Sequence, residues 1–236
     1  MIGIFLFVIH VVLDIEVKMG KLKGILKNVE ISKLNKNIYW LKFPSSYLLT
    51  STMLRFEEYY ESPEFHDKIF DLEEFMDWYA EKYGKFSYFE DWVGFNIPGN
   101  VLRPFINNSF NFLSRKEQSI VEYFKNIKVE NIYIIATLQS EKIGVLKHEI
   151  AHALYYTNNN YKNKINSLLL KENLSEIYIF LEKRGYAKKV FTDESHAYLI
   201  SDKTKNFKRL QKELRKVFNK YYEPIKEKIS DSKTCY

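Results

Sequence analysis

Residues 145–156 contain a pair of histidines four residues apart in an apolar run. On an α-helix, His148 and His152 leave the same face about one turn apart, so both imidazoles can reach a single point. Glu149 follows the first histidine and lies beside that face. The flanking residues supply apolar surface, namely Val145, Leu146, Ile150, Ala151, Ala153 and Leu154. Burying two imidazoles and a carboxylate on such a helix is costly unless a cation neutralises them, so the pattern predicts a metal-binding helix.

Paired imidazoles of this spacing suit a zinc ion. Zn²⁺ binds imidazole nitrogen at about 2.0–2.1 Å, and its catalytic sites combine three protein ligands with one open position for water. Such a water loses its proton near neutral pH, and Glu149 is placed to accept that proton as a general base. We therefore expect one Zn²⁺ ion with His148 and His152 as ligands. The alternative is a histidine–glutamate cluster that hydrogen bonds hold together without a metal.

The His-Glu-x-x-His pattern resembles the zincin metallopeptidases, whose branches differ in the third ligand. One branch has a further histidine within about ten residues, but residues 155–160 here contain no histidine or carboxylate, which excludes that branch. Residues 191–199 instead look like the downstream helix of the gluzincins, where a glutamate completes the metal site. The resemblance covers about residues 128–201 and implies Glu194 as the third ligand, with His196 and Asp193 as alternatives.

The helix that carries Glu194 is predicted to begin at Thr192, a suitable N-cap. Its period places Glu194 on one face with Ala197, Tyr198 and Ser201, and His196 on the opposite side. In the gluzincins a neighbouring acid orients a histidine ligand, and Asp193 suits this role by accepting a hydrogen bond from the far ring nitrogen. An acidic helix start is also favoured by the helix dipole without any metal.

A second electrophile is usually needed to stabilise the negative oxygen that forms during amide hydrolysis. The nearest candidates in the sequence are Tyr155, Tyr156 and Tyr198. Because the chain contains 18 tyrosines, the alternative for each of them is an ordinary packing residue.

A β-branched and aromatic run at 131–137 predicts a strand just before the metal helix. Zincins place an edge strand there, and an extended peptide can pair with such an edge. The alternative is a buried core strand. The chemistry expected from the whole pattern is peptide-bond hydrolysis by a zinc-dependent metallopeptidase acting on a peptide or protein substrate. Two other functions stay open, a zinc hydrolase of a non-peptide amide or ester and a catalytically silent zincin-like binding or regulatory protein.

The predicted fold class is α+β, mostly helical, with a small sheet next to the metal helix. Residues 1–127 are expected to form an N-terminal helical and aromatic region, and residues 128–236 a zincin-like region, or both one continuous domain. The other predicted elements are a strand at 38–43 and helices at 47–61, 71–83, 114–125, 161–172, 174–184 and 205–229. Residues 86–112 are expected to be irregular and rich in aromatic side chains, forming core packing, a second wall of a cleft or a cover over it.

Composition bears on the setting of the protein. The single cysteine, Cys235, cannot form an internal disulfide, which favours a reducing, cytoplasmic environment. Residues Met1–Leu13 are nearly all apolar but fall short of the roughly 20 residues that span a membrane, so a membrane role is disfavoured. A buried strand is expected there, with a true start at Met19 or an export or anchoring segment as alternatives.

The positive charge of the chain is concentrated at its C-terminal end. Residues 202–236 contain 11 Lys/Arg and 5 Asp/Glu, an excess of six that equals the net charge of the whole chain, 36 minus 30. This charge falls on the predicted helix at 205–229, whose apolar stripe is expected to pack and whose basic face is expected to be solvated. Binding of an acidic partner through the basic face is the alternative. No nucleic-acid-binding motif accompanies the helix.

Overall fold

A computed structural model describes residue 22 and residues 24–140, 143–184, 186, 188–201 and 206–231. The strand predicted at 1–13 and Cys235 lie outside the described residues. Within them, helices predominate around one four-stranded sheet, which confirms the α+β class. No helix in the described ranges is both long and apolar enough to cross a membrane.

The sheet has the strand order β1-β2-β4-β3, formed by β1 (Glu30–Lys33), β2 (Ile38–Phe43), β3 (Gly94–Pro98) and β4 (Tyr133–Leu138). β4 runs parallel to β2, with Trp40 opposite Ile135, and antiparallel to β3. The predicted strand before the metal helix is therefore internal and not an edge strand. The edge beside it is β3, a strand inside the stretch that we predicted to be irregular.

Side chains alternate along the strands, so the two faces of the sheet belong to two separate cores. Leu41 and Ile134 lie in one core, whereas Trp40 and Ile135 lie in the other. Both faces are buried, which explains why β2 and β4 are almost continuously apolar.

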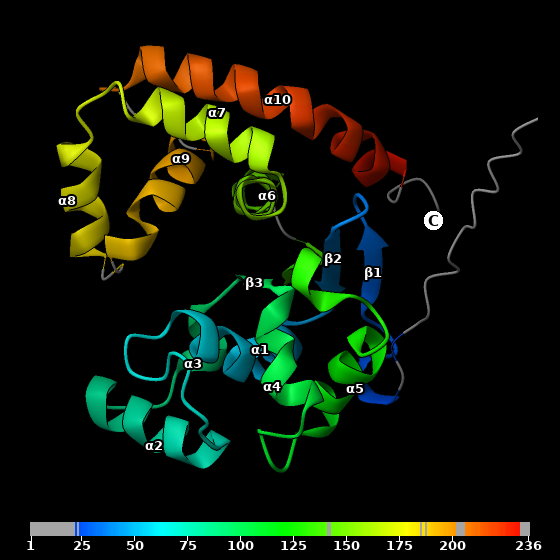
Figure 1. The fold of residues 1–236 in the computed structure, drawn as a ribbon. Helices are drawn as coiled ribbons and strands as arrows, with labels where there is room; N and C mark the ends of the chain where they lie inside the picture. Colours follow the sequence, from blue (N-terminus) through cyan, green and yellow to red (C-terminus); the bar gives the residue numbers. More distant parts are fainter. Residues whose placement is uncertain are drawn as a thin grey trace, which may run out of the picture.

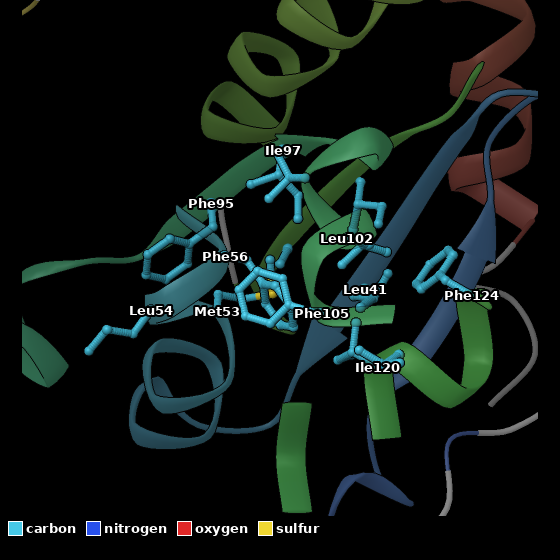
Figure 2. Packing of buried hydrophobic residues seen from close by; sticks show 14 of the residues in the cluster. Leu41, Met53, Leu54, Phe56, Phe95, Ile97, Leu102, Phe105, Ile120 and Phe124 are labelled. Atoms are coloured by element: carbon cyan, nitrogen blue, oxygen red, sulfur yellow. The ribbon is translucent and has the colours of Figure 1, made fainter. Parts of the chain in front are cut away.

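Five helices lie on the first face, drawn in the lower half of Figure 1. They are α1 (Ser46–Glu61), α2 (Leu72–Tyr83), α3 (Tyr88–Asp91), α4 (Arg103–Ile106) and α5 (Arg115–Phe124). Figure 2 shows Met53 and Phe56 of α1 packed between Phe95 of the edge strand and Phe105 of α4. The rings of Phe105 and Phe110 stack with centroids 4.0 Å apart. The aromatic stretch at 86–112 thus contributes core packing, one of its three predicted roles.

The remaining helices cover the second face, in the upper half of Figure 1. They are α6 (Ile143–Thr157), α7 (Asn159–Leu169), α8 (Ser175–Lys183), α9 (Phe191–Ser201) and α10 (Lys208–Asp231). The predicted apolar stripe of α10 is buried in this core through Leu210, Leu214, Phe218 and Ile225. Four short 3-10 helices complete the described chain, η1 (Gly24–Leu26), η2 (Gly99–Leu102), η3 (Val129–Asn131) and η4 (Lys188–Val190).

Capping residues fix most of the helix starts that the sequence predicted. Asp71 accepts a hydrogen bond from the Glu74 backbone, and Ser114 forms a complete capping box with Glu117. Gly84 ends α2 with φ 79°, a left-handed conformation that glycine adopts without strain. The predicted start at Thr192 is wrong, because α9 begins at Phe191 and η4 leads directly into it. Packing of Phe191 in the upper core extends the helix past the local capping signal.

Candidate metal centre

Helix α6 carries His148, Glu149 and His152, and it packs against the sheet on one side and α9 on the other. Its apolar residues Leu146, Ile150, Ala153 and Leu154 are buried in the upper core. This anchoring directs the two histidines towards α9. His152 is only 3% exposed, so its imidazole is held in a largely dry environment.

Glu194 of α9 meets the two histidines, as the resemblance implied. His148 Nε2 lies 3.1 Å from His152 Nε2 and 3.8 Å from Glu194 Oε2. His152 Nε2 lies 3.6 Å from Glu194 Oε1. One ligand atom from each of the three residues falls within 4.8 Å of the others, and this is the one group of three possible ligands found in the described part of the chain.

Two observations indicate that the triad suits a metal ion. Its donor set of two imidazole nitrogens and one carboxylate is that of catalytic zinc sites with an open fourth position. Glu194 is only 6% exposed, and its Oε2 has no hydrogen-bond partner among the described residues. A buried carboxylate oxygen without a partner is expensive, and a bound cation removes that cost.

Burial and mutual charge shift the pKa values of the three ligands in different directions. Burial, with the charge of His152, lowers the pKa of His148 to about 3, so its ring is neutral and able to bind metal. Burial disfavours a charge on His152, but Asp193 and Glu194 outweigh it and place the pKa of His152 well above its usual value. Burial raises the pKa of Glu194 to about 7. In the metal-free protein, His152 and Glu194 therefore favour their protonated forms, and each must lose its proton to bind a metal.

Asp193, the predicted supporting acid, contacts Nδ1 of His152, the ring nitrogen that is not directed at the triad. Its Oδ1 lies 3.1 Å from His152 Nδ1 and 3.2 Å from His196 Nδ1. Burial opposes ionisation of Asp193, but the charges and hydrogen bonds of the two histidines lower its pKa. A carboxylate on Nδ1 fixes the ring so that Nε2 faces the metal position. His148 is held in the same way, since its Nδ1 lies 3.2 Å from the Ser201 hydroxyl.

His196, the alternative ligand, lies outside the triad. It is fully buried, its Nε2 is 3.2 Å from the Ala151 carbonyl oxygen, and its ring stacks on Tyr155. His196 thus links α9 to α6 through the Ala151 carbonyl and contacts Asp193, the acid that holds His152.

The general-base candidate, Glu149, is held by a residue that the sequence did not single out. Asn96 of the edge strand donates from Nδ2 to Glu149 Oε2 at 2.6 Å. The Tyr133 hydroxyl in turn donates to Asn96 Oδ1. Gly94 of the same strand lies beside this carboxylate, since a Cβ there would be in ordinary contact with Glu149 Oε1, at 3.7 Å. Burial raises the pKa of Glu149, which suits a group that must accept a proton near neutral pH.

The end of α1 brings further acidic groups to the site, which the sequence analysis also missed. Burial, with repulsion from Glu61, Glu58 and Glu149, raises the pKa of Glu57 well above its usual value. Burial likewise raises the pKa of Glu61, against the attraction of His152. Nothing in the local sequence links these residues to a metal helix almost a hundred residues later, so no sequence signal could have found them.

The three tyrosine candidates have different surroundings. The hydroxyl of Tyr155 donates a hydrogen bond to Asn166 at 2.7 Å, and the hydroxyl of Tyr156 donates to Asn100 at 3.3 Å. The ring of Tyr198 packs edge-on against His148 with centroids 4.9 Å apart. Of the three, Tyr198 is therefore the one that contacts a ligand of the triad.

No family model, curated protein or solved structure matches this chain. The chemistry of the site is therefore inferred from its own residues.

Proposed function

We propose that the protein is a zinc-dependent metallopeptidase of the gluzincin type. The observation that carries this proposal is the meeting of His148, His152 and Glu194 at one point, with Glu149 beside them. A structural zinc site would be expected to have four protein ligands, whereas three ligands leave a position open for chemistry.

His148, His152 and Glu194 would hold the ion. When bound, zinc supplies Lewis-acid activation of a water molecule and of the substrate carbonyl. Glu149 accepts the proton of the attacking water and transfers it to the amine of the leaving peptide. Asn96 keeps the carboxylate of Glu149 in one orientation during both steps, since it fixes Oε2 through a 2.6 Å hydrogen bond.

The edge strand supports a peptide as the substrate. β3 pairs with β4 on one side, stands at the edge of the sheet and runs next to Glu149. An extended peptide can add to such an edge as a further strand, which presents its backbone carbonyl groups in a regular row. A small amide or ester has no backbone to pair in this way, so this geometry favours the peptidase over the non-peptide hydrolase.

The substitution Glu149→Gln tests the proposal. We expect the variant to bind zinc like the wild type, because Glu149 is not a ligand, and to lose cleavage of a mixed peptide library followed by mass spectrometry. His148→Ala should lose both zinc, measured by elemental analysis, and cleavage. Glu122→Gln, an exposed site on α5, is the matched control and should change neither.

Undiminished cleavage by Glu149→Gln would show that the base assignment is wrong. Cleavage of aryl amides or esters but not of any peptide would favour the non-peptide hydrolase instead. Zinc binding without turnover of any of these substrates would favour a catalytically silent binding protein.

A further inference from the structure

Helix α8 packs against α9, the helix that carries Glu194, and its C-terminal end places an arginine near the metal centre. Arg184 caps α8, and its Nη1 donates a hydrogen bond to the Tyr198 hydroxyl at 3.3 Å. The ring of Tyr198 in turn packs edge-on against His148, with centroids 4.9 Å apart. One side chain, that of Tyr198, therefore separates Arg184 from a ligand of the triad.

Aromatic rings hold the guanidinium group of Arg184 in place. Its central carbon lies 4.6 Å from the ring centroid of Phe180 and 5.8 Å from that of Tyr198. These two rings meet edge-on, with centroids 5.5 Å apart. The Tyr198 hydroxyl also lies 3.2 Å from the Tyr186 hydroxyl, so the acceptor of the Arg184 hydrogen bond is itself held. A guanidinium group fixed in this way loses less rotamer entropy when it binds a ligand.

Arg184 has no counter-ion among the residues that the structure describes. Its side-chain contacts there are the hydrogen bond to Tyr198 and the two aromatic rings, and the side chain is otherwise exposed. The bond to Tyr198 uses one of the five N–H donors of an arginine. The remaining donors can bind a carboxylate in the bidentate geometry that arginine favours.

We propose that Arg184 binds a carboxylate of the substrate and makes the enzyme selective for peptides with a negative charge near the cleaved bond. This inference rests on the proposed peptidase function. An extended peptide advances about 3.3–3.6 Å per residue, so a carboxylate on Arg184 belongs to a residue within a few positions of that bond. The carboxylate has two possible sources, the C-terminus of a short peptide and the side chain of an aspartate or glutamate.

The first experiment measures binding and needs no turnover. The zinc-loaded full-length protein is titrated by calorimetry with two series of hydroxamates, which bind zinc through the hydroxamate group. Succinyl hydroxamates cover the leaving-amine side and carry Leu-Gln with a free C-terminus, Leu-Glu amide or the neutral Leu-Gln amide. Acetyl-Glu-Leu hydroxamate and the neutral acetyl-Gln-Leu hydroxamate cover the other side.

We expect one anionic compound to bind about fivefold more tightly than the neutral compound of its series, which is the size of a well-formed exposed ion pair. The compound that does so identifies the source of the carboxylate and the side of the cleaved bond on which it lies. An equal affinity of the wild type for anionic and neutral compounds in both series overturns the subsite.

The substitution Arg184→Gln should bring this affinity ratio close to one. Because the side chain is exposed, the fold is expected to persist, and thermal unfolding checks this. The matched control is Lys183→Gln, which removes the same charge from the last turn of α8 and should keep the wild-type ratio. An unchanged ratio in Arg184→Gln overturns the subsite. An equal loss in Lys183→Gln also overturns it, since the preference would then reflect the general charge of this surface.

Peptide cleavage separates this inference from the function on which it rests. Matched peptides with free or amidated C-termini, and with glutamate or glutamine near the cleaved bond, are digested by the wild type. Cleavage of all of them with the same kcat/KM overturns the subsite and leaves the peptidase intact. Selective hydroxamate binding without cleavage of any peptide retains the subsite and refutes the peptidase. Absence of hydroxamate binding by the zinc-loaded protein overturns the subsite.

Discussion

Zinc binding to the triad should release about two protons per ion at pH 6. With a pKa of about 7, Glu194 is about nine-tenths protonated at that pH. His152, whose pKa is raised well above its usual value, carries about one further proton. His148, with a pKa of about 3, carries none. Each ligand must lose its proton to bind the metal, so the sum is about two.

Calorimetry in two buffers with different ionisation enthalpies gives the number of protons released. We chose pH 6 because a zinc-bound water, with a pKa near 7, still keeps its own proton there. Glu194→Gln should bind zinc more weakly and release about one proton fewer. The charge of His152 also affects the pKa of Glu61. The titration is therefore repeated with Glu61→Gln, which removes any proton that this carboxyl would release.

Two results would contradict the assigned protonation states or ligands. Release of less than about one proton by the wild type would mean that Glu194 and His152 are not both protonated in the metal-free site. Equal release by the wild type and Glu194→Gln would mean that Glu194 is not a ligand, whatever the affinity of the site.

Three further perturbations follow from the structure. Glu194 should stabilise the metal-free protein at pH 4.5 by about 3 kcal/mol more than at pH 7, because its pKa is higher folded than unfolded. Urea unfolding of the wild type and of Glu194→Gln at both pH values measures this difference, and saturating zinc should reverse the trend of the wild type. Asn96→Ala should lower kcat on a peptide substrate about tenfold or more, because it removes a charge-assisted hydrogen bond to Glu149 that contributes about 1.5–3 kcal/mol. The zinc content should stay unchanged. An unchanged kcat would mean that Asn96 does not position the base. Arg55→Met should lower the free energy of unfolding by about 3–5 kcal/mol, because it leaves the buried carboxylate of Glu117 without its 2.6 Å ion pair. A smaller change would indicate that this carboxylate takes up a proton.

Local rules were enough to predict most of the helices and the core of the site. Helical periodicity set His148 and His152 on one face, and capping residues such as Ser114 placed the helix starts, because both depend on residues within one turn. The buried run at 133–138 was also evident as a strand. Thr192 shows the limit of such rules, since tertiary packing of Phe191 extends the helix beyond the predicted cap.

The edge strand could not be predicted from its own residues. Gly94–Pro98 begins with glycine and ends with proline, two residues that normally indicate turns. The segment is a strand because β4 offers it hydrogen-bond partners and because Phe95 and Ile97 enter the lower core. Its place at the edge, and that of β4 inside the sheet, depend on which strands meet, and the spacing of side chains along one strand does not contain that information.

The residues of α6 alone require a helix that presents two imidazoles and a carboxylate on neighbouring positions, because the α-helical period places them there. The surroundings of these three side chains depend instead on the packing of distant elements. The packing of α9 on α6 brings Glu194 to the histidines, the strand order brings Asn96 to Glu149, and the path of α1 beneath the sheet brings Glu57 and Glu61 near them. These contacts join residues far apart in the chain, and burial of the two apolar faces of one sheet sets their positions.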